Sequence, residues 1–392
     1  MKVLIISDVY FPRINGVSTS ILTFRRELAR LGHEVTLIAP EYGNTLMEGE
    51  NDILRVPSRR VPFDPEDRLM KAGSIRKLTT AFVAGTFDLV HVQTPFIAHY
   101  AGIALARRLG VPCIASYHTF FEEYLFHYFP LAPKALMRYA ARRFSRSQGN
   151  ALDALVVPSQ AIAKILRDYG VHRPTRIIPT GVNAIDLHGG DGAAFRQRHG
   201  IKTDQPVVIF VGRVAFEKKI DFLFHVLCQV QTYLPNVLLV IAGDGPARNH
   251  LQQLAQHLGI QNNVLFTGYL DRNGGLRDVY RAADVFAFAS DTETQGLVLL
   301  EAMALGVPIV STAEMGTWDI LQAGQGALVA TRDVTDFSTK LVALLRDATL
   351  RNRLSLEGIT YAKQWTAASM SVRLADFYRE VTAPGFNSNA MD

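Results

Sequence analysis

Short apolar runs alternate with helix-forming segments along almost the whole chain, and they do so in two separate series. The first series of runs lies at 2–7, 32–39, 88–92, 113–116 and 154–159. The second lies at 206–212, 237–242, 264–267, 283–289, 307–310 and 327–329. Strands that alternate with helices in this way build right-handed βαβ units and a parallel sheet. Because 392 residues are too many for one core, we predict an α/β protein with two Rossmann-like, doubly wound domains.

A polar, glycine-rich stretch, LHGGDG at 187–192, lies between the two series. Its composition is typical of a linker. We therefore predict a first domain over 1–183 and a second domain over 184–365. The closing helical segment, 366–392, is expected to cross back onto the first domain. Two such domains would face each other across a cleft, with the carboxyl ends of both sets of strands directed into it.

Composition narrows the class of protein. Hydrophobic residues make up 48% of the chain and charged residues 20%, as in an ordinary globular protein. No apolar run approaches the ~20 residues of a membrane-spanning helix, and the opening segment lacks the apolar core of a signal peptide. Cys113 and Cys228 lie far apart in apolar segments, which favours buried thiols in a reducing compartment. We expect a cytoplasmic protein with no nucleic-acid partner.

Positive charge is concentrated in the first half of the chain. Residues 1–181 contain 23 Lys and Arg against 15 Asp and Glu, a net charge of +8, whereas residues 182–392 have a net charge of −3. A basic stripe at helical spacing consists of Lys134, Arg138, Arg142 and Arg146. The opposite face of that helix would carry Leu136, Met137, Ala140 and Phe144. The stripe is either a solvated helix face or, with the aromatic segment 120–129, part of a surface over 120–147 that contacts anionic lipid.

Two carboxylates mark the most informative stretch of the second half. Glu293 and Glu301 stand eight positions apart in SDTETQGLVLLEAMALGVP, residues 290–308. The segment 297–305 is apolar nearly all round, which predicts a largely buried helix with Glu301 inside it and Glu293 in the loop before it. A buried carboxylate needs polar partners, and the first N–H groups of a helix form an anion site. The order of loop carboxylate, helix N-terminus and second carboxylate suits a sugar, its diphosphate and a ribose. The alternative is that Glu301 caps a neighbouring loop.

A basic loop follows the first strand of the second half, with Arg213 and Lys218 between the run 206–212 and the next helix. Beside a helix N-terminus, the two cations could neutralise a diphosphate without a metal ion. No cluster of Cys and His has metal-ligand spacing, so we expect no metal. Taken alone, the two cations are better explained as a solvated loop; taken together with Glu293 and Glu301, they favour a diphosphate site.

In the first half, two candidate residues follow strand ends. Asn15 and Gly16 mark a loop after the strand 2–7, and His118 follows the strand 113–116. Open α/β sheets bind ligands at the carboxyl ends of their strands, which favours a functional role for Gly16 and His118. The alternative for His118 is a structural histidine. The first loop has no G-x-G-x-x-G pattern, so a dinucleotide site is not indicated.

In their order and spacing these motifs resemble the family-4 retaining glycosyltransferases, which have the GT-B fold. The resemblance covers nearly the whole chain and is carried by Gly212-Arg213, Glu217-Lys218, Gly243-Asp244-Gly245-Pro246 and the stretch from Glu293 to Pro308. Two positions depart from the family pattern. Thr294-Gln295-Gly296 stands where Gly-Phe-Gly is usual, and Lys219 stands where a glycine is common.

The resemblance implies roles in the second domain, which would bind the donor. Arg213 and Lys218 would bind the leaving diphosphate, and Glu301 would accept hydrogen bonds from the ribose hydroxyls. Glu293 would hold a hydroxyl of the donor sugar. Further loop and backbone contacts would come from Gln295, Gly296 and Leu297.

In the first domain, which would bind the acceptor, the resemblance implies two contacts with the donor. Gly16 would let the backbone approach the phosphate, and His118 would face the sugar near the reacting carbon. His118 and Glu293 are thus the candidate catalytic residues, and no protein nucleophile is indicated.

The implied activity is transfer of a hexose from a nucleotide sugar, such as UDP-glucose, to an acceptor hydroxyl without a cofactor or metal. The segments YHTFFEEY and ETQGL are similar to the diacylglycerol glucosyltransferase branch. That likeness implies a membrane-lipid acceptor and a peripheral position at the inner face of the cell membrane. The alternatives are a soluble sugar or sugar-phosphate acceptor, or a GT-B sugar-nucleotide epimerase. A non-catalytic sugar-binding protein would have no use for the phosphate site.

Overall fold

The computed structural model describes residues 1–13, 15–43, 52–61, 64–118, 133–183, 189–271 and 274–388. The chain divides into two compact units. Unit 1 comprises Met1–Gly181 and Ala367–Asp392, and unit 2 comprises Val182–Thr366. The boundaries expected from the sequence, after 183 and after 365, lie within two residues of these.

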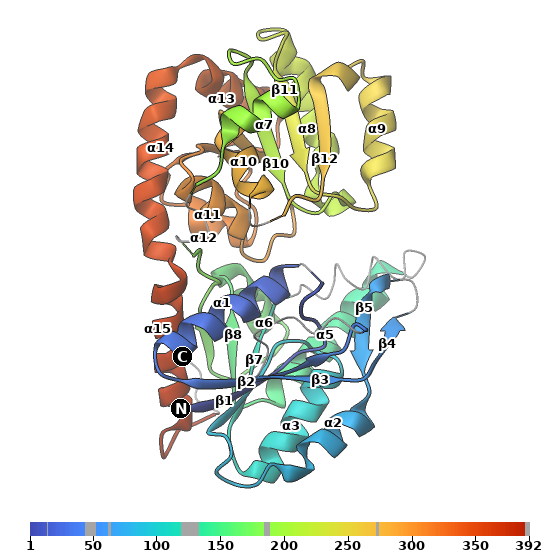
Figure 1. The fold of residues 1–392 in the computed structure, drawn as a ribbon, viewed down its shortest axis with the longest axis vertical. Coiled ribbons are helices and arrows are strands. Elements are labelled where there is room, and N and C mark those ends of the chain that lie inside the picture. The colour runs from blue at the N-terminus through green and yellow to red at the C-terminus, as the bar shows by residue number, and fades with distance from the viewer. Residues whose placement is uncertain are drawn as a thin grey trace. The chain divides into compact units, whose positions relative to one another are not determined.

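Unit 1 is built on a parallel sheet. Among the described residues seven strands form it, in the order β3-β2-β1-β6-β7-β8-β9 (Figure 1). The strands are β1 (Lys2–Ile6), β2 (Glu34–Pro40), β3 (Ile53–Val56), β6 (Leu89–Val92), β7 (Cys113–Ser116), β8 (Ala154–Val157) and β9 (Thr175–Ile177). A separate antiparallel pair joins β4 (Ser58–Val61) to β5 (Asp64–Met70). The strand order reverses between β1 and β6, so the topological switch point lies at their carboxyl ends.

Helices cover both faces of this sheet, which is why its strands are continuously apolar rather than alternating. They are α1 (Gly16–Arg30), α2 (Ala72–Leu78), α3 (Ile97–Leu109), α5 (Lys134–Asn150), α6 (Gln160–Asp168) and α15 (Ala367–Thr382). The last helix, α15, packs on α1 within unit 1 (Figure 1). Leu374 and Phe377 of α15 share one hydrophobic cluster with Phe24 and Leu28 of α1. The C-terminal segment is thereby part of the core of unit 1.

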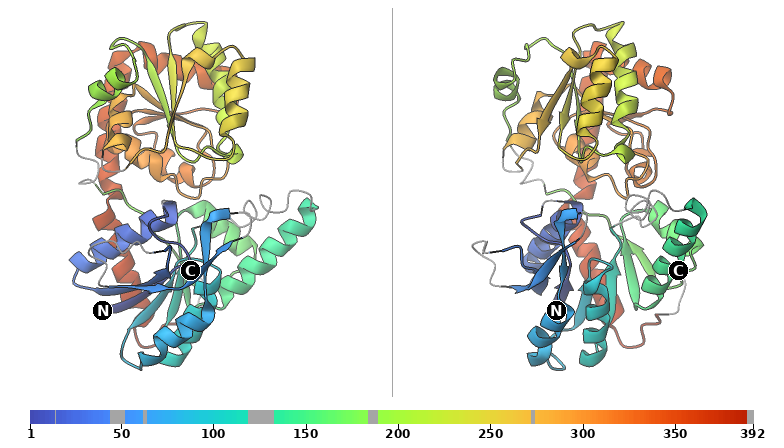
Figure 2. Two further views of the ribbon diagram at one scale, coloured as in Figure 1. Left: turned by 45° about the vertical axis from the view of Figure 1, so that its right-hand side comes forward. Right: turned by 90° about the vertical axis from the view of Figure 1, so that its right-hand side faces the viewer.

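Unit 2 has the same architecture as unit 1, a parallel sheet with helices on both faces. Its parallel sheet, over the described residues, has six strands in the order β12-β11-β10-β13-β14-β15. The strands are β10 (Val207–Val211), β11 (Leu238–Ala242), β12 (Val264–Gly268), β13 (Val285–Phe288), β14 (Ile309–Ser311) and β15 (Ala327–Val329). The helices are α7 (Gly192–Arg198), α8 (Ile220–Gln231), α9 (Arg248–His257), α10 (Gly275–Ala282), α11 (Leu297–Ala304), α12 (Gly316–Leu321), α13 (Val334–Arg346) and α14 (Ala348–Ala362). They lie on both faces of the sheet (Figure 2), and the switch point lies between β10 and β13.

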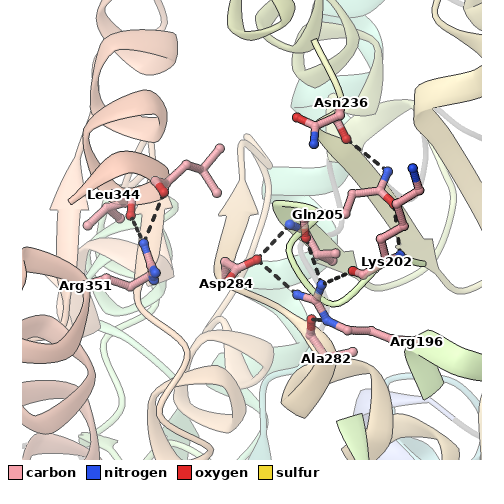
Figure 3. Close-up of polar contacts among 10 residues, drawn as sticks. Arg196, Lys202, Gln205, Asn236, Ala282, Asp284, Leu344 and Arg351 are labelled. Atoms are coloured by element: carbon pink, nitrogen blue, oxygen red, sulfur yellow. Dashed lines mark hydrogen bonds and ion pairs between the residues drawn. The ribbon is translucent and has the colours of Figure 1, made fainter. Parts of the chain in front are cut away.

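Arg196 of α7 anchors this helix to the sheet of unit 2 (Figure 3). Its guanidinium donates to the carbonyl oxygens of Ala282 at 2.9 Å and Gln205 at 2.8 Å, and pairs with the Asp284 carboxylate at 3.1 Å. Asp284 also accepts from the N–H of Val207 at 2.8 Å. Since Val207 begins β10, one guanidinium ties α7 to the amino ends of β10 and β13, which is the edge opposite the candidate site.

The linker prediction was wrong for 189–192. A Cβ on Gly190 would lie 2.9 Å from the backbone of Arg277, and one on Gly192 would lie 2.3 Å from the carbonyl oxygen of Arg281. Asp191 caps α7. These glycines therefore serve close packing of α7 on α10 inside unit 2, whereas 184–188 lies outside the described residues.

Helix α5 also differs from its prediction. Met137 is buried and Phe144 is half-buried, as expected, but Leu136 is 59% exposed and Ala140 is exposed too. The buried stripe continues instead through Ala141 and through polar residues nearer the end of the helix. The segment 120–129 and the side chain of Lys134 lie outside the described part of the chain.

No helix among the described residues is long and apolar enough to cross a membrane. Within the same residues, Cys113 and Cys228 are both free cysteines.

Candidate active site

The candidate residues fall into two sets, one at the carboxyl edge of each sheet. In unit 2, β10 leads through Gly212 to Arg213, whose side chain is exposed and has no hydrogen bond or ion pair with any described residue. The chain then forms a short 3-10 turn, η3 (Phe216–Lys218), before α8. Arg213 is thus available to a ligand at the end of the central strand.

The structure brings Lys218 and Glu293 together. Nζ of Lys218 lies 2.6 Å from Oε2 of Glu293, and the two side chains are only 17% and 22% exposed. They are 75 residues apart in sequence, but they follow β10 and β13, which are neighbouring strands. A partly shielded ion pair holds both side chains at the strand ends, and the ammonium retains further N–H donors for a ligand.

The backbone at Lys219 shows why glycine is common at this position in the family pattern. Its φ is +53°, in the left-handed region that costs a residue with a Cβ roughly 1–2 kcal/mol. A glycine at this position would adopt the same backbone at little cost. Nζ of Lys219 lies 3.7 Å from the Asp291 carboxylate.

The loop before α11 is held against the start of α12. The N–H of Gly316 donates to the carbonyl oxygen of Glu293 at 2.9 Å, and a Cβ on Gly316 would lie 2.0 Å from the carbonyl oxygen of Thr294. Gly296, the N-cap residue of α11, has φ +92° and no side-chain cap. Gln295 is buried and Leu297 begins the helix. Gly296 offers no side-chain cap to α11, and the N–H of Leu299 donates to the carbonyl oxygen of Gly296 at 2.9 Å. The N–H groups at such a helix start can bind an anion.

Glu301 is buried in α11, as predicted, and it has a polar partner. It is 4% exposed, and the hydroxyl of Tyr280 donates to its Oε2 at 3.1 Å. The same hydroxyl lies 3.2 Å from the carbonyl oxygen of Val298. Nothing in the sequence links Tyr280, on α10, to Glu301, so sequence reasoning missed this partner.

In unit 1, Gly16 is the first residue of α1, so the prediction of a loop there was wrong. Asn15 is the N-cap, and its Oδ1 accepts from the N–H of Ser18 at 2.8 Å. A Cβ on Gly16 would have no atom within 4 Å. The fold of unit 1 itself therefore does not require a glycine at the start of α1.

His118 follows β7 and contacts the end of the neighbouring strand β6. Its Nε2 lies 2.8 Å from Oε1 of Gln93; Nε2 donates with the amide in this orientation and accepts if the amide is turned. Burial lowers the pKa of His118 to about 4. At neutral pH the ring is therefore uncharged and suits a sugar hydroxyl better than a phosphate.

Two further polar residues at this edge were missed. Asp8, just after β1, is fully buried and accepts from the hydroxyl of Thr94 and the N–H of Ala98, both at 2.9 Å. Burial raises the pKa of this carboxyl to about 6. Asp8 and Gln93 each follow a buried strand, so the positional argument that selected His118 would also have found them.

His91 lies behind His118 and is almost fully buried. Its Nδ1 is 2.6 Å from the hydroxyl of Tyr378 on α15, and its Nε2 is 2.9 Å from Oγ of Ser116. Burial, together with the nearby imidazole of His118, lowers the pKa of His91 from 6.5 to about 3. His91 thereby links the end of β7 to α15 through hydrogen bonds with Ser116 and Tyr378.

We expect unit 1 to lose stability on acidification through His91. Because its pKa is lower in the folded state, its contribution is fully present above pH 6.5 and falls as the pH decreases toward 3. At pH 5 the loss should be about 2 kcal/mol. Hydrogen exchange of the β6 amides at pH 7.5 and 5.0 measures it, with His91→Phe as the comparison. The difference between wild type and His91→Phe in the free energy of opening of these amides should be about 2 kcal/mol smaller at pH 5.0 than at pH 7.5. An equal difference at both pH values would contradict the lowered pKa of His91.

No group of three or more His, Cys, Asp and Glu that could hold a metal ion occurs among the described residues. The set in unit 2 offers positive charge, helix N–H groups and two carboxylates to a ligand. The set in unit 1 offers a neutral imidazole.

Comparison with known proteins gives two family matches that together span most of the chain. The model described as "Glycosyltransferase Family 4" matches residues 14–185, and that described as "Glycosyl transferases group 1" matches residues 191–361.

Several relatives align over most of their length. The alpha-monoglucosyldiacylglycerol synthase of Streptococcus pneumoniae is 33% identical over 79% of this chain and 71% of its own. A GDP-mannose-dependent alpha-mannosyltransferase of Corynebacterium glutamicum is 28% identical over 98% and 90%. Among solved structures, Anabaena Alr3699/HepE in complex with UDP has a TM-score of 0.75 at 19% identity, covering 96% of this chain and 99% of that one.

Proposed function

Because the chain belongs to glycosyltransferase family 4, the retaining GT-B enzymes that transfer a hexose from a nucleotide sugar, we propose that its donor is UDP-glucose and its acceptor is diacylglycerol. The name of the Streptococcus pneumoniae relative supports a glucosyl donor and this acceptor. The UDP held by Anabaena HepE supports the nucleotide. The mannosyltransferase relative favours one competing donor, GDP-mannose.

We assign donor binding to unit 2. Arg213 and Lys218 would neutralise the diphosphate together with the N-terminus of α11. Glu301, whose position is held by Tyr280, would accept from the ribose hydroxyls. Glu293, next to Lys218, would accept from a hydroxyl of the hexose. The pairing of Lys218 with Glu293 at 2.6 Å supports this assignment, because a hexose and the phosphate attached to it would need neighbouring binding groups.

The chemistry would consist of charge stabilisation without a protein nucleophile. As the bond to the anomeric carbon breaks, negative charge grows on the leaving diphosphate, where two cations and helix N–H groups stabilise it. The acceptor hydroxyl would attack from the same face and pass its proton to the departing phosphate, which gives retention. Neutral His118 would orient a hydroxyl of the sugar, and Gly16 would leave room for the diphosphate.

We expect activity to survive EDTA. Arg213, Lys218 and the helix N-terminus supply positive charge that a metal would otherwise provide. The measurement is UDP release with and without EDTA, on protein freed of metals by dialysis. Loss of turnover that manganese or magnesium restores would show that the leaving group is stabilised differently.

A surface of α5 supports a membrane-bound acceptor. Leu136 is 59% and Tyr139 is 64% exposed, and Arg138 and Arg143 beside them are exposed without an ion pair to any described residue. Arg142 instead lies over the ring of Tyr169 at 5.4 Å. An exposed helix face that mixes aromatic, aliphatic and basic side chains is typical of interfacial membrane contact.

Charge reversal on this face should weaken membrane binding. At about 1 kcal/mol per basic residue near an anionic surface, Arg138→Glu/Arg143→Glu should reduce co-sedimentation with phosphatidylglycerol vesicles about tenfold or more. The matched control is Arg76→Glu/Lys77→Glu on α2, which makes the same change of charge at two exposed positions. Equal binding by all three proteins would make the α5 face an ordinary solvated surface.

The proposed function is tested by UDP release from UDP-glucose with dispersed diacylglycerol, with soluble sugar phosphates, and without acceptor. We expect rapid release only with diacylglycerol. Release that depends on a soluble acceptor would move the assignment to another branch of the family, and conversion of the sugar nucleotide without acceptor would favour an epimerase.

A further inference from the structure

A pocket in unit 1 extends from His118 into the space between α3 and α5. Its cavity volume is about 40 Å³, and this cavity lies within a partly open hollow of about 470 Å³ that includes open solvent. Its apolar wall includes Val92, Ala115, Leu152, Leu155 and Leu166. Apart from His118 and its neighbours at the strand ends, its polar wall includes His99, Ser145 and Gln148. Concave, mostly apolar sites with a few placed polar groups are typical of small-molecule binding.

Gln148 of α5 has an amide atom without a partner. The side chain is 8% exposed, its Nε2 lies 2.9 Å from the hydroxyl of Tyr100, and its Oε1 has no hydrogen-bond partner among the described residues. A tyrosine hydroxyl both donates and accepts, so the amide can equally be turned with Oε1 toward Tyr100 and Nε2 toward the pocket. In either orientation one polar atom remains unsatisfied, which is costly for a buried group.

His99 of α3 gives the pocket a second uncharged polar group. The residue is 3% exposed, and neither ring nitrogen has a hydrogen bond with a described residue. Burial lowers the pKa of His99 to about 4, so the ring is neutral at physiological pH and offers one N–H donor.

The charge of the pocket restricts its ligand. No Lys, Arg, Asp or Glu is among the described residues that line it. A phosphate brought into this space would lose its hydration without gaining a counter-ion, which is strongly unfavourable. A neutral, mostly apolar molecule with hydrogen-bond acceptors meets no such penalty.

We propose that this pocket binds the diester end of the acceptor, with Nε2 of Gln148 and the N–H of His99 donating to its two ester carbonyl oxygens. This inference rests on the proposed function and assigns its acceptor site. The single free hydroxyl of diacylglycerol makes neither contact and stays available for transfer on the His118 side. Gln148 and His99 thereby select a neutral diester against phosphorylated acceptors.

The first test compares acceptor and donor kinetics of Gln148→Leu, His99→Phe and the control Tyr100→Phe, which removes only the protein partner of Gln148. With dioctanoylglycerol, both pocket variants should raise the KM for the lipid about tenfold, with an unchanged KM for UDP-glucose. Tyr100→Phe should change either KM less than about twofold. A wild-type lipid KM in both pocket variants would overturn the pocket while leaving the proposed function in place.

The second test needs neither donor nor turnover. Dioctanoylglycerol should raise the thermal midpoint of the wild-type chain, and dioctanoyl phosphatidic acid, which has the same chains and a phosphate, should not. Gln148→Leu should lose the shift, and Tyr100→Phe should keep it. An equal shift by both lipids, or the same shift in Gln148→Leu, would overturn the pocket. A wild-type shift without any glucosylation of the lipid would instead leave the pocket standing and overturn the proposed function.

Discussion

Replacing Arg213 or Lys218 with alanine is expected to lower kcat/KM for the nucleotide sugar by about 10- to 150-fold, the equivalent of one charge-assisted hydrogen bond to phosphate. The side chain of Arg213 is exposed and has no hydrogen bond or ion pair with a described residue, so its variant should unfold like the wild type. Lys218→Ala should have the larger effect, because it also leaves Glu293 without its partner at 2.6 Å. Steady-state kinetics with varied UDP-glucose, together with thermal unfolding, measure both effects.

The matched control for these variants is Lys219→Gly. It removes a positive charge from the same loop, but Lys219 forms an ion pair with Asp291 at 3.7 Å, and its φ of +53° is one that glycine adopts readily. We expect kcat/KM within about twofold of the wild type and equal or higher stability. Wild-type kinetics in Arg213→Ala, or an equal loss in Lys219→Gly, would contradict the assignment of the diphosphate to Arg213 and Lys218.

The second large effect is expected from Gly316→Ala. The new Cβ would lie 2.0 Å from the carbonyl oxygen of Thr294, and since that oxygen belongs to the backbone, α12 or the loop 293–296 must move. The strain should lower the free energy of unfolding by about 1–3 kcal/mol. Because the same loop carries Glu293 and leads into α11, a shift of about 1 Å should lower kcat/KM about 100-fold.

Gly73→Ala is the control for Gly316→Ala. Gly73 lies in α2, where a Cβ would have no atom within 4 Å, so this variant should be at least as stable as the wild type. Thermal unfolding and steady-state kinetics are measured on both. A Gly316→Ala protein with wild-type kcat/KM would show that the position of the 293–296 loop does not matter for turnover.

Among the described residues, the six strands of unit 2, five strands of unit 1 and the buried helix α11 could be predicted because they depend on local patterns, whereas β3, β4, β5 and β9 of unit 1 were not predicted. The apolar run 113–116 is β7 to the residue, and the all-round apolar segment 297–305 is the buried helix α11. Continuous apolar runs are what a parallel sheet covered on both faces requires, so short-range sequence carries this information.

The pairings inside the site could not be predicted, because they depend on which strands become neighbours. Lys218 meets Glu293 only because β10 lies beside β13, and Tyr280 reaches Glu301 from a separate helix. Because His118 follows a strand, the sequence predicts that it lies at the carboxyl edge of the sheet. The hydrogen bond between His118 and Gln93 could not be predicted in this way.

Two errors have a common physical origin in packing against segments distant in sequence. The glycines at 190 and 192 look like a linker, but they allow close contact with α10. The buried face of α5 includes Gln148, a polar residue that pairs with Tyr100 of α3, so a search for an apolar stripe chose Leu136 and Ala140 instead. Local composition does not distinguish a flexible glycine from a closely packed one.

The most direct test of the central claim is the structure of the product formed from UDP-glucose and dioctanoylglycerol. The product is isolated, and its mass and the coupling constant of its anomeric proton are measured by mass spectrometry and NMR. We expect a single glucosyl-diacylglycerol with the α configuration of the donor. A β-linked product would contradict retention, and a reaction that yields no glycolipid while consuming UDP-glucose would contradict transfer to a lipid.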